Sequence, residues 1–167
     1  MNVFLHTTIL RHRKENLKKC SLHGLEPRED LHFLTYPIDP IPFLENGILL
    51  DLDAPPLSKE DHGRSLFLID GTWKYAAVMS RQLPYPEKWT RRSLPPEIQT
   101  AYPRKQTDCI DPKRGLASVE ALYIAHLILG YEIEGLLDHY YWKKEFLELN
   151  SRFLSCNTTF HPPSQMN

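Results

Sequence analysis

Ser65-Leu66-Phe67-Leu68-Ile69-Asp70-Gly71-Thr72-Trp73 is the stretch that decides the fold of this 167-residue chain. Its run of four apolar residues, Leu66 to Ile69, is typical of a strand that is buried on both faces in a parallel sheet. The strand ends in an acid and a glycine, and the pattern over Thr72–Gln82 predicts a helix. A buried strand that leads directly into a helix is typical of α/β domains, which bind ligands at the carboxyl ends of their strands.

The rest of the chain extends this pattern of strands and helices. Apolar and β-branched runs predict strands at Val3–Ile9, Leu31–Tyr36, Ile48–Leu50 and Arg92–Leu94. Helical patterns occur at Leu57–Asp61, with Ser58 as its cap, and at Ala117–Leu129, Tyr131–Asp138 and Tyr140–Phe153. Because strands alternate with helices before helices dominate, we expect an α/β domain with a mostly parallel sheet and a helical C-terminal part.

Length and composition predict one folded domain. Hydrophobic residues make up 41% and charged residues 25% of the chain, as is usual for a globular protein. We expect this domain to span residues 1–156, with an N-terminal part to about residue 60, a ligand-binding part over 61–156, and a flexible tail over 157–167.

Cysteine usage and hydropathy predict a cytoplasmic protein with no membrane span. The three cysteines are widely spaced and form no C-x-x-C motif, which indicates a reducing compartment. The apolar run at the N-terminus is too short for the apolar region of a signal peptide. The longest apolar stretch, Leu122–Leu129, contains His126 and is far too short to cross a bilayer.

The sequence lacks the motifs of several common types of functional site. The chain lacks G-x-G-x-x-G, the P-loop, H-E-x-x-H and G-x-S-x-G patterns, so a glycine-rich nucleotide site, a metal site and an esterase-type site are not expected. A lone histidine on an apolar helix face, such as His126, indicates a core residue rather than a metal ligand.

Asp70-Gly71-Thr72-Trp73 is the first candidate site. Asp70 would place a carboxylate at the carboxyl edge of the sheet, and Trp73 would offer an aromatic face that suits a cation such as a sulfonium. The alternative is a plain capped turn in which Asp70 or Thr72 caps the helix and Trp73 enters the core.

Gly115–Ala121 is the second candidate site. A loop enters a helix whose first turn has backbone N–H groups for an anion, with Ser118 as the natural cap and Glu120 suited to the helix dipole. An ordinary helix start explains the same residues.

Taken together, these motifs resemble those of the DTW-domain family and of the small-subunit rRNA aminocarboxypropyltransferases. Asp70-Gly71-Thr72-Trp73 is similar to the signature of the DTW family. Arg92-Ser93-Leu94-Pro95 and Ser118-Val119-Glu120-Ala121 also resemble segments of the family. The whole resemblance runs in order from Lys18 to Asn150. Three further segments resemble the rRNA-modifying branch: Lys18-Lys19-Cys20-Ser21, Gly47-Ile48-Leu49-Leu50 with Leu57-Ser58, and Trp142 with Phe146 and Asn150.

The resemblance implies a SPOUT-like fold, expected to be trefoil-knotted and monomeric, that binds S-adenosylmethionine. It implies transfer of the 3-amino-3-carboxypropyl group to a uridine-type nucleotide, with release of methylthioadenosine. Trp73 would shield the methyl group, and Asp70 would remove a proton from the base or orient the substrate. The residues that it places around the cofactor are Ser21, Leu50, Asp70, Trp73, Leu94, Leu116, Ala117, Ser118 and Ala121; for the leucines, core packing is the alternative.

The expected macromolecular partner is RNA, with small-subunit rRNA ahead of tRNA. The net charge is −1, but basic residues gather locally, and a mixed solvated surface explains them equally well. The predicted RNA contacts are Arg11, Arg13, Lys18, Lys19, Arg91, Arg92, Arg104 and Lys105. The rival functions are a tRNA enzyme of the DTW type, a knotted RNA methyltransferase, and a non-catalytic RNA- or ribosome-binding assembly factor.

Overall fold

The computed structural model describes residues 7–103 and 115–157, and within them five strands form one parallel sheet. The sheet order is β2-β1-β4-β3-β5, and every described pairing is parallel. Parallel neighbours require crossover connections, which these helices and loops provide. The strands are β1 (Thr7–His12), β2 (Leu31–Tyr36), β3 (Ile48–Leu50), β4 (Leu66–Asp70) and β5 (Thr90–Arg92).

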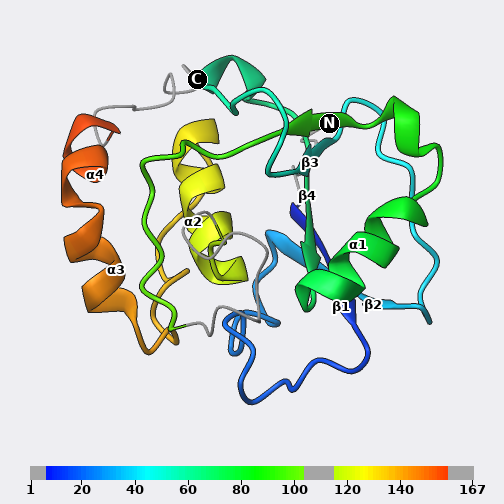
Figure 1. Cartoon of the computed structure of the whole chain (residues 1–167), viewed down its shortest axis with the longest axis horizontal. Coiled ribbons are helices and arrows are strands. Elements are labelled where there is room, and N and C mark those ends of the chain that lie inside the picture. The colour runs from blue at the N-terminus through cyan, green and yellow to red at the C-terminus, as the bar shows by residue number, and fades with distance from the viewer. Residues whose placement is uncertain (1–6, 104–114, 158–167) are drawn as a thin grey trace.

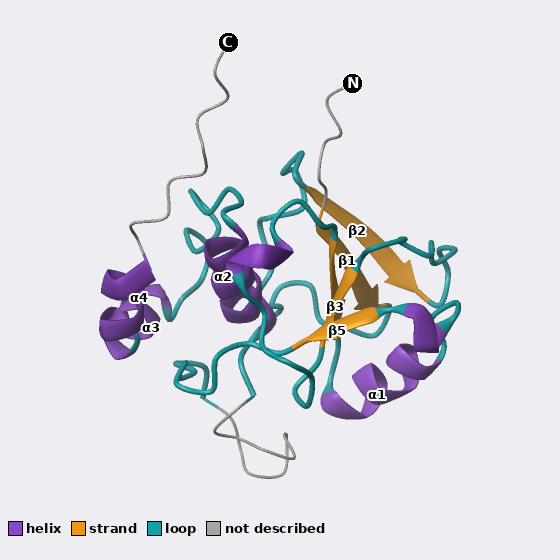
Figure 2. Ribbon diagram, turned by 90° about the horizontal axis from the view of Figure 1, so that it is seen from above, coloured by secondary structure: helices purple, strands orange, loops and turns teal. Residues whose placement is uncertain are grey.

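Helices cover both faces of this sheet, which lies between α1 and α2 in Figures 1 and 2. Successive side chains of a strand point to opposite faces. Ile9 and Leu68 therefore join the core under α2 and α3, whereas Leu10 and Phe67 join a second core with Met79 of α1. The helices are α1 (Trp73–Arg81), α2 (Ser118–Leu129), α3 (Lys143–Leu149) and α4 (Ser151–Asn157), with 3₁₀ turns at Lys59–Asp61 and Pro86–Lys88.

Because all five strands are parallel, their carboxyl ends lie at one edge of the sheet. Arg11 of β1 lies opposite Asp70 of β4, and Leu50 of β3 lies opposite Arg92 of β5. The loops that leave these strands, together with the first turns of α1 and α2, therefore meet above the same edge, where α/β proteins bind ligands.

The predicted α/β class with a mostly parallel sheet is confirmed, as are the strands at Leu31–Tyr36 and Ile48–Leu50. The opening strand runs on to His12, beyond the predicted end at Ile9, because it pairs with β2 as far as His12 and with β4 as far as Arg11; residues 3–6 of the predicted strand lie outside the described residues. The strand predicted at Arg92–Leu94 instead covers Thr90–Arg92. The trefoil knot and the division near residue 60 stay predictions, and residues 158–167 of the predicted tail lie outside the described part of the chain.

Two helix predictions near the C-terminus are wrong. Residues 131–138 are not helical: turns begin at residue 134, and Gly135 has a positive φ of 78°, which an α-helix cannot contain. The helix predicted at Tyr140–Phe153 divides into α3 and α4 at Asn150. The amide of Asn150 donates to the Phe146 and Gln99 carbonyls, so it ends α3 and fixes the segment that follows β5.

His126 on α2 is a core residue, as its position on an apolar face predicts. Its Nδ1 donates to the Glu132 carbonyl at 2.8 Å, so its Nε2 accepts from the Thr7 hydroxyl at 2.7 Å. Burial lowers the pKa of His126, because the charged imidazolium would lose its hydration. Among the helices of the described segments, none has the length and hydropathy needed to span a membrane.

The buried His126 predicts acid sensitivity. Below about pH 6.5 the unfolded chain binds a proton at this histidine, while the folded state, with its lower pKa, does not. The free energy of unfolding should therefore fall as the pH drops through this range. Urea denaturation at several pH values should show a shallower dependence for His126→Gln than for the wild type; parallel curves would contradict the assignment.

Candidate functional site

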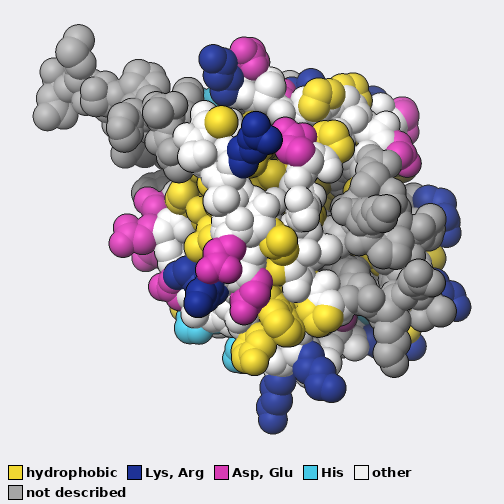
Figure 3. All heavy atoms as spheres, turned by 60° about the vertical axis from the view of Figure 1, so that its left-hand side comes forward, with side chains coloured by type: hydrophobic (Ala, Val, Ile, Leu, Met, Phe, Trp, Pro, Cys, Tyr) yellow, Lys and Arg dark blue, Asp and Glu magenta, His cyan; other side chains and the backbone are white. Residues whose placement is uncertain are grey.

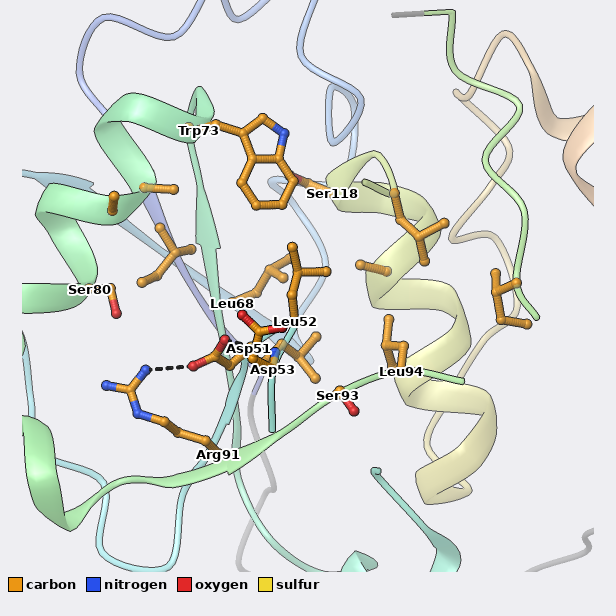
Figure 4. Close-up of a pocket in the computed structure, with 18 of the residues that line it drawn as sticks. Asp51, Leu52, Asp53, Leu68, Trp73, Ser80, Arg91, Ser93, Leu94 and Ser118 are labelled. Atoms are coloured by element: carbon orange, nitrogen blue, oxygen red, sulfur yellow. Dashed lines mark hydrogen bonds and ion pairs between the residues drawn. The ribbon is translucent and has the colours of Figure 1, made fainter. Parts of the chain in front are cut away.

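A cavity of about 670 Å³ opens at the carboxyl edge of the sheet, within the size range of small-molecule sites. Its walls come from the ends of β3, β4 and β5, from one side of α1 and from the first turn of α2. These segments are far apart in the sequence, and the parallel sheet brings them together. In Figure 4 the Trp73 indole stands beside Ser118, and Asp51 and Arg91 lie at the opposite end.

Six of the residues that the resemblance places around a cofactor line this cavity. They are Leu50, Trp73, Leu94, Leu116, Ser118 and Ala121. All six are half-buried rather than enclosed in the core. The three leucines pack against the core on one side and form apolar walls of the cavity on the other.

Trp73 is the first residue of α1, and Thr72 caps the helix by accepting a hydrogen bond from the Tyr75 amide at 3.4 Å. The capped-turn alternative is thus correct for Thr72 but wrong for Trp73, which lines the cavity instead of entering the core. A half-buried tryptophan face in an apolar cavity suits a flat or cationic group.

Ser21, Asp70 and Ala117 do not line the cavity but lie behind its wall. Ser21 Oγ accepts from the Val119 amide at 3.1 Å, so it satisfies a donor in the first turn of α2. Ala117 is buried, and its amide donates to Glu120 at 2.8 Å. These residues hold α2 in place.

Asp70 is the centre of a buried polar network that joins four segments. Its Oδ1 accepts from Ser118 Oγ at 2.7 Å, and its Oδ2 accepts from Arg11 Nε at 3.3 Å and from Cys20 Sγ at 3.2 Å. Arg11 also pairs with Glu26 at 3.2 Å and lies 4.7 Å from the Phe33 ring centre. The network therefore links β1, the loop after it, β4 and the start of α2.

This geometry assigns Asp70 a positioning role. Both of its oxygens are occupied, the residue is 3% exposed, and it does not line the cavity. A general base must reach the proton that it removes. The two roles predicted for Asp70, proton removal and orientation of the substrate, both need contact with the substrate; the position of Asp70 instead favours orientation of Ser118.

The start of α2 differs from the sequence prediction. Ser118 is the first helical residue and not the cap, because its hydroxyl donates to Asp70. Glu120, fully buried, takes over the capping function: it accepts from the Ala117 amide, from the Ala101 amide at 2.9 Å and from Thr100 Oγ1 at 2.6 Å. Glu120 thereby ties the segment after β5 to α2.

Asp51, Asp53 and Arg91 form a polar end of the cavity that the sequence prediction did not include. Asp51 follows β3 directly, just as Asp70 ends β4, and this repeated position of an acid was the available signal. Arg91, predicted as an RNA contact, is half-buried and pairs with Asp51 at 2.9 Å.

The predicted RNA contacts divide into three groups. Arg13, Lys18 and Lys19 are exposed on the loop after β1. The RNA contact predicted for Arg11 is corrected. Because β1 extends to His12, the Arg11 guanidinium is buried beside Asp70 and does not reach the surface. Arg92 pairs with the buried Asp61 at 3.2 Å, and Arg104 and Lys105 lie outside the described residues.

The face of the molecule nearest α3 and α4 shows no patch of basic side chains. In Figure 3 acidic, basic and hydrophobic side chains are interspersed on this face. Within residues 7–103 and 115–157, no group of three or more His, Cys, Asp or Glu side chains could hold a metal ion.

Removal of the Asp70 carboxylate should destabilise the fold. Asp70→Asn leaves the exposed Glu26 as the remaining charge partner of the buried Arg11, and loss of one member of a buried pair costs about 3 kcal/mol. Asp51→Asn breaks a half-exposed pair and should cost less than about 1 kcal/mol. Urea denaturation of both variants measures the difference, and equal stability of the two would contradict the role given to Asp70.

Cys20 should be unreactive. Burial, together with the charge of Asp70, raises the pKa of its thiol to about 12, so the thiolate is scarce at neutral pH. Cys156 is exposed. After brief treatment of the native protein with iodoacetamide at pH 8, peptide mass spectrometry should find Cys156 modified and Cys20 protected; fast modification of Cys20 would contradict the network.

No family model and no curated protein matches the chain. Among solved structures, the chain is similar to the SAM-dependent rRNA:acp-transferase Tsr3 from Vulcanisaeta distributa, with 24% sequence identity and a TM-score of 0.67. The match covers 92% of this chain and 83% of the other. The likeness shows that the two proteins share a fold.

Proposed function

We propose that this protein transfers the aminocarboxypropyl group of S-adenosylmethionine to a uridine-type nucleotide in RNA. The observation that carries the proposal is the cavity at the sheet edge. It unites Leu50, Trp73, Leu94 and Ser118, which belong to separate sequence segments that resemble the same transferase family. The structurally similar protein is itself described as a SAM-dependent rRNA:acp-transferase.

The residues of the cavity fit S-adenosylmethionine. The Trp73 face suits the sulfonium cation, and the leucine walls suit the thioether region and the purine ring. Carboxylates of Asp51 and Asp53 offer acceptors at the other end. The volume of about 670 Å³ also suits a ligand of this size.

When bound, S-adenosylmethionine supplies an electrophilic Cγ beside a sulfonium: the S–Cγ bond breaks as the base nitrogen bonds to Cγ, and methylthioadenosine leaves with the electron pair. The nitrogen gives its proton to solvent. Trp73 selects Cγ by orientation, because an indole packed against the methyl carbon keeps the base away from it.

Ser118 can act only as an acceptor toward the cavity. Its single hydroxyl proton is donated to Asp70, so its lone pairs remain for a ligand donor. The ammonium of the transferred group is such a donor. Asp70, held by Arg11 and Cys20, thus acts through Ser118 and does not touch the ligand.

RNA is the proposed acceptor, and rRNA is the first candidate. The exposed Arg13, Lys18 and Lys19 lie on the loop after β1, and β1 ends at the same sheet edge as the cavity, so they can contact phosphates. The rRNA-type segments and the description of the similar structure support rRNA. The Asp70-Gly71-Thr72-Trp73 spelling favours tRNA as the second candidate.

The test of the reaction uses S-adenosylmethionine labelled separately in the methyl and carboxyl carbons, with unmodified rRNA and tRNA. Carboxyl label in RNA with release of methylthioadenosine would support the proposal, and the labelled RNA would identify the target. Methyl label in RNA would mean a methyltransferase. Cofactor binding without transfer to either RNA would mean that the RNA substrate is wrong or lacks a prior modification, and failure to bind the cofactor would favour the non-catalytic alternative.

Trp73→Ala should weaken S-adenosylmethionine binding by about tenfold or more, because it removes both the aromatic face and its buried area. Trp73→Phe should retain most of the affinity. Tyr141→Ala, which removes an aromatic that is 84% exposed and does not line the cavity, is the matched control. Isothermal titration measures all three, and unchanged affinity of Trp73→Ala would place the ligand elsewhere.

A further inference from the structure

Three aromatic rings gather where β1 and β2 end beside α1. His12 is the last residue of β1, and its imidazole stacks on the Tyr75 ring of α1, with the ring centres 4.0 Å apart and the planes at 8°. Tyr36 ends β2 opposite His12, and its ring centre lies 5.6 Å from that of the imidazole. The Tyr36 hydroxyl donates to Gln82 at the end of α1. These contacts hold the Tyr75 ring in a fixed orientation.

This aromatic cluster of His12, Tyr36 and Tyr75 is a neighbour of the cavity. Gly71 lines the cavity, and a Cβ atom placed on it would lie 3.5 Å from the His12 Cβ and 3.6 Å from the Tyr75 Cβ. Trp73 and Tyr75 are two residues apart on a helix, so they point to different sides of α1. Trp73 lines the cavity and Tyr75 does not. The start of α1 therefore separates the aromatic cluster from the cavity.

Exposed cations surround the aromatic cluster. Arg13 and Lys14 directly follow His12, Lys74 precedes Tyr75, and all three are exposed. Lys14 Nζ lies over the Tyr75 ring at 5.8 Å from its centre, close to the limit of about 6 Å for a cation–π contact. Such a contact at an exposed site is weak, so Lys14 can leave the ring and bind an anion. The cluster thus joins an aromatic surface to mobile positive charge.

Aromatic rings beside lysines and arginines are typical of surfaces that bind single-stranded nucleic acid. The bases stack on the rings, and the cations contact the phosphates. Residues 13–19 hold four cations against one carboxylate, that of Glu15, so the loop after β1 attracts a polyanion. In a duplex each base is already stacked between its neighbours and is not open to a protein ring. The cluster therefore favours unpaired nucleotides over paired ones.

We propose that Tyr75 stacks on a base next to the modified nucleotide in an unpaired segment of RNA, while Arg13 and Lys14 contact the phosphates of that segment. This inference rests on the proposed function and narrows its substrate to single-stranded RNA. A base that is to react in the cavity must leave its neighbours in the strand. The neighbour that stays outside is held on Tyr75, on the other side of the start of α1.

The experiment measures RNA binding by fluorescence anisotropy with a labelled oligouridylate of about ten nucleotides, alone and paired with oligoadenylate. The wild type should bind the single strand several-fold more tightly than the duplex. Tyr75→Leu keeps an apolar side chain against the core but removes the ring, and should weaken single-strand binding about tenfold. Tyr75→Phe keeps the ring and should retain the affinity. Tyr141→Ala, which removes an aromatic that is 84% exposed, is the matched control.

Two further readouts separate stacking from charge and from a structural defect. Lys14→Ala should lower the slope of log Kd against log salt by about 0.7, the value for one phosphate contact on a single strand, whereas Tyr75→Leu should leave the slope unchanged. Lys144→Ala, at an exposed lysine of α3, is the control for charge. The affinity for S-adenosylmethionine should stay unchanged in Tyr75→Leu, because a distorted α1 would also displace Trp73.

Three results would overturn the inference. They are equal single-strand affinity of the wild type and Tyr75→Leu, duplex binding as tight as single-strand binding, and loss of S-adenosylmethionine affinity in Tyr75→Leu. Failure of the proposed function has a different sign: the wild type would transfer no carboxyl label from S-adenosylmethionine, while its binding of the single strand would still depend on Tyr75.

Discussion

The carboxylate of Asp70 is the interaction on which the site depends. A buried charge is stable only when it is paired and hydrogen-bonded, and Asp70 meets this condition through Arg11, Cys20 and Ser118. These partners come from β1, from the loop after it and from α2, so the requirement of one carboxylate fixes the relative position of three segments. Glu120 makes a similar connection between α2 and the segment after β5. Asp70 and Glu120 together hold in place the segments that form the walls of the cavity.

The cavity combines properties that a single motif cannot supply. Its tryptophan comes from α1, its apolar walls come from segments after β3 and β5 and before α2, and its hydroxyl comes from the first turn of α2. The hydroxyl of Ser118 gains a fixed direction from Asp70, and the carboxylate of Asp51 gains one from Arg91. A ligand therefore meets oriented acceptors at both ends and apolar surface between them. Such an arrangement suits a long ligand with a cation near one end.

Local pattern accounts for much of the fold and for part of the site. The continuous apolar run Leu66–Ile69 predicts a central parallel strand, since burial on both faces leaves no alternation. The motifs of Trp73 and Ser118 are enough to place both residues in the site, whereas the motif that contains Asp70 does not show that its carboxylate lies behind the cavity wall. The burial of Arg11 could not be predicted, because it depends on where β1 ends and on a partner 59 residues away. Asp51 follows its strand as Asp70 ends its own, which is a signal in the sequence, but its ion pair with Arg91 depends on the pairing of β3 with β5.

The central claim is that Trp73 packs against the methyl group of the bound donor and leaves Cγ open to attack. Nuclear magnetic resonance of S-adenosylmethionine carrying a ¹³C-methyl label tests it directly, because an indole face shifts the proton signal of a methyl group that lies over it to higher field. The account predicts an upfield shift on binding to the wild type that is lost in Trp73→Ala at saturating ligand. A bound methyl signal that is unshifted, or equally shifted in both proteins, would contradict it.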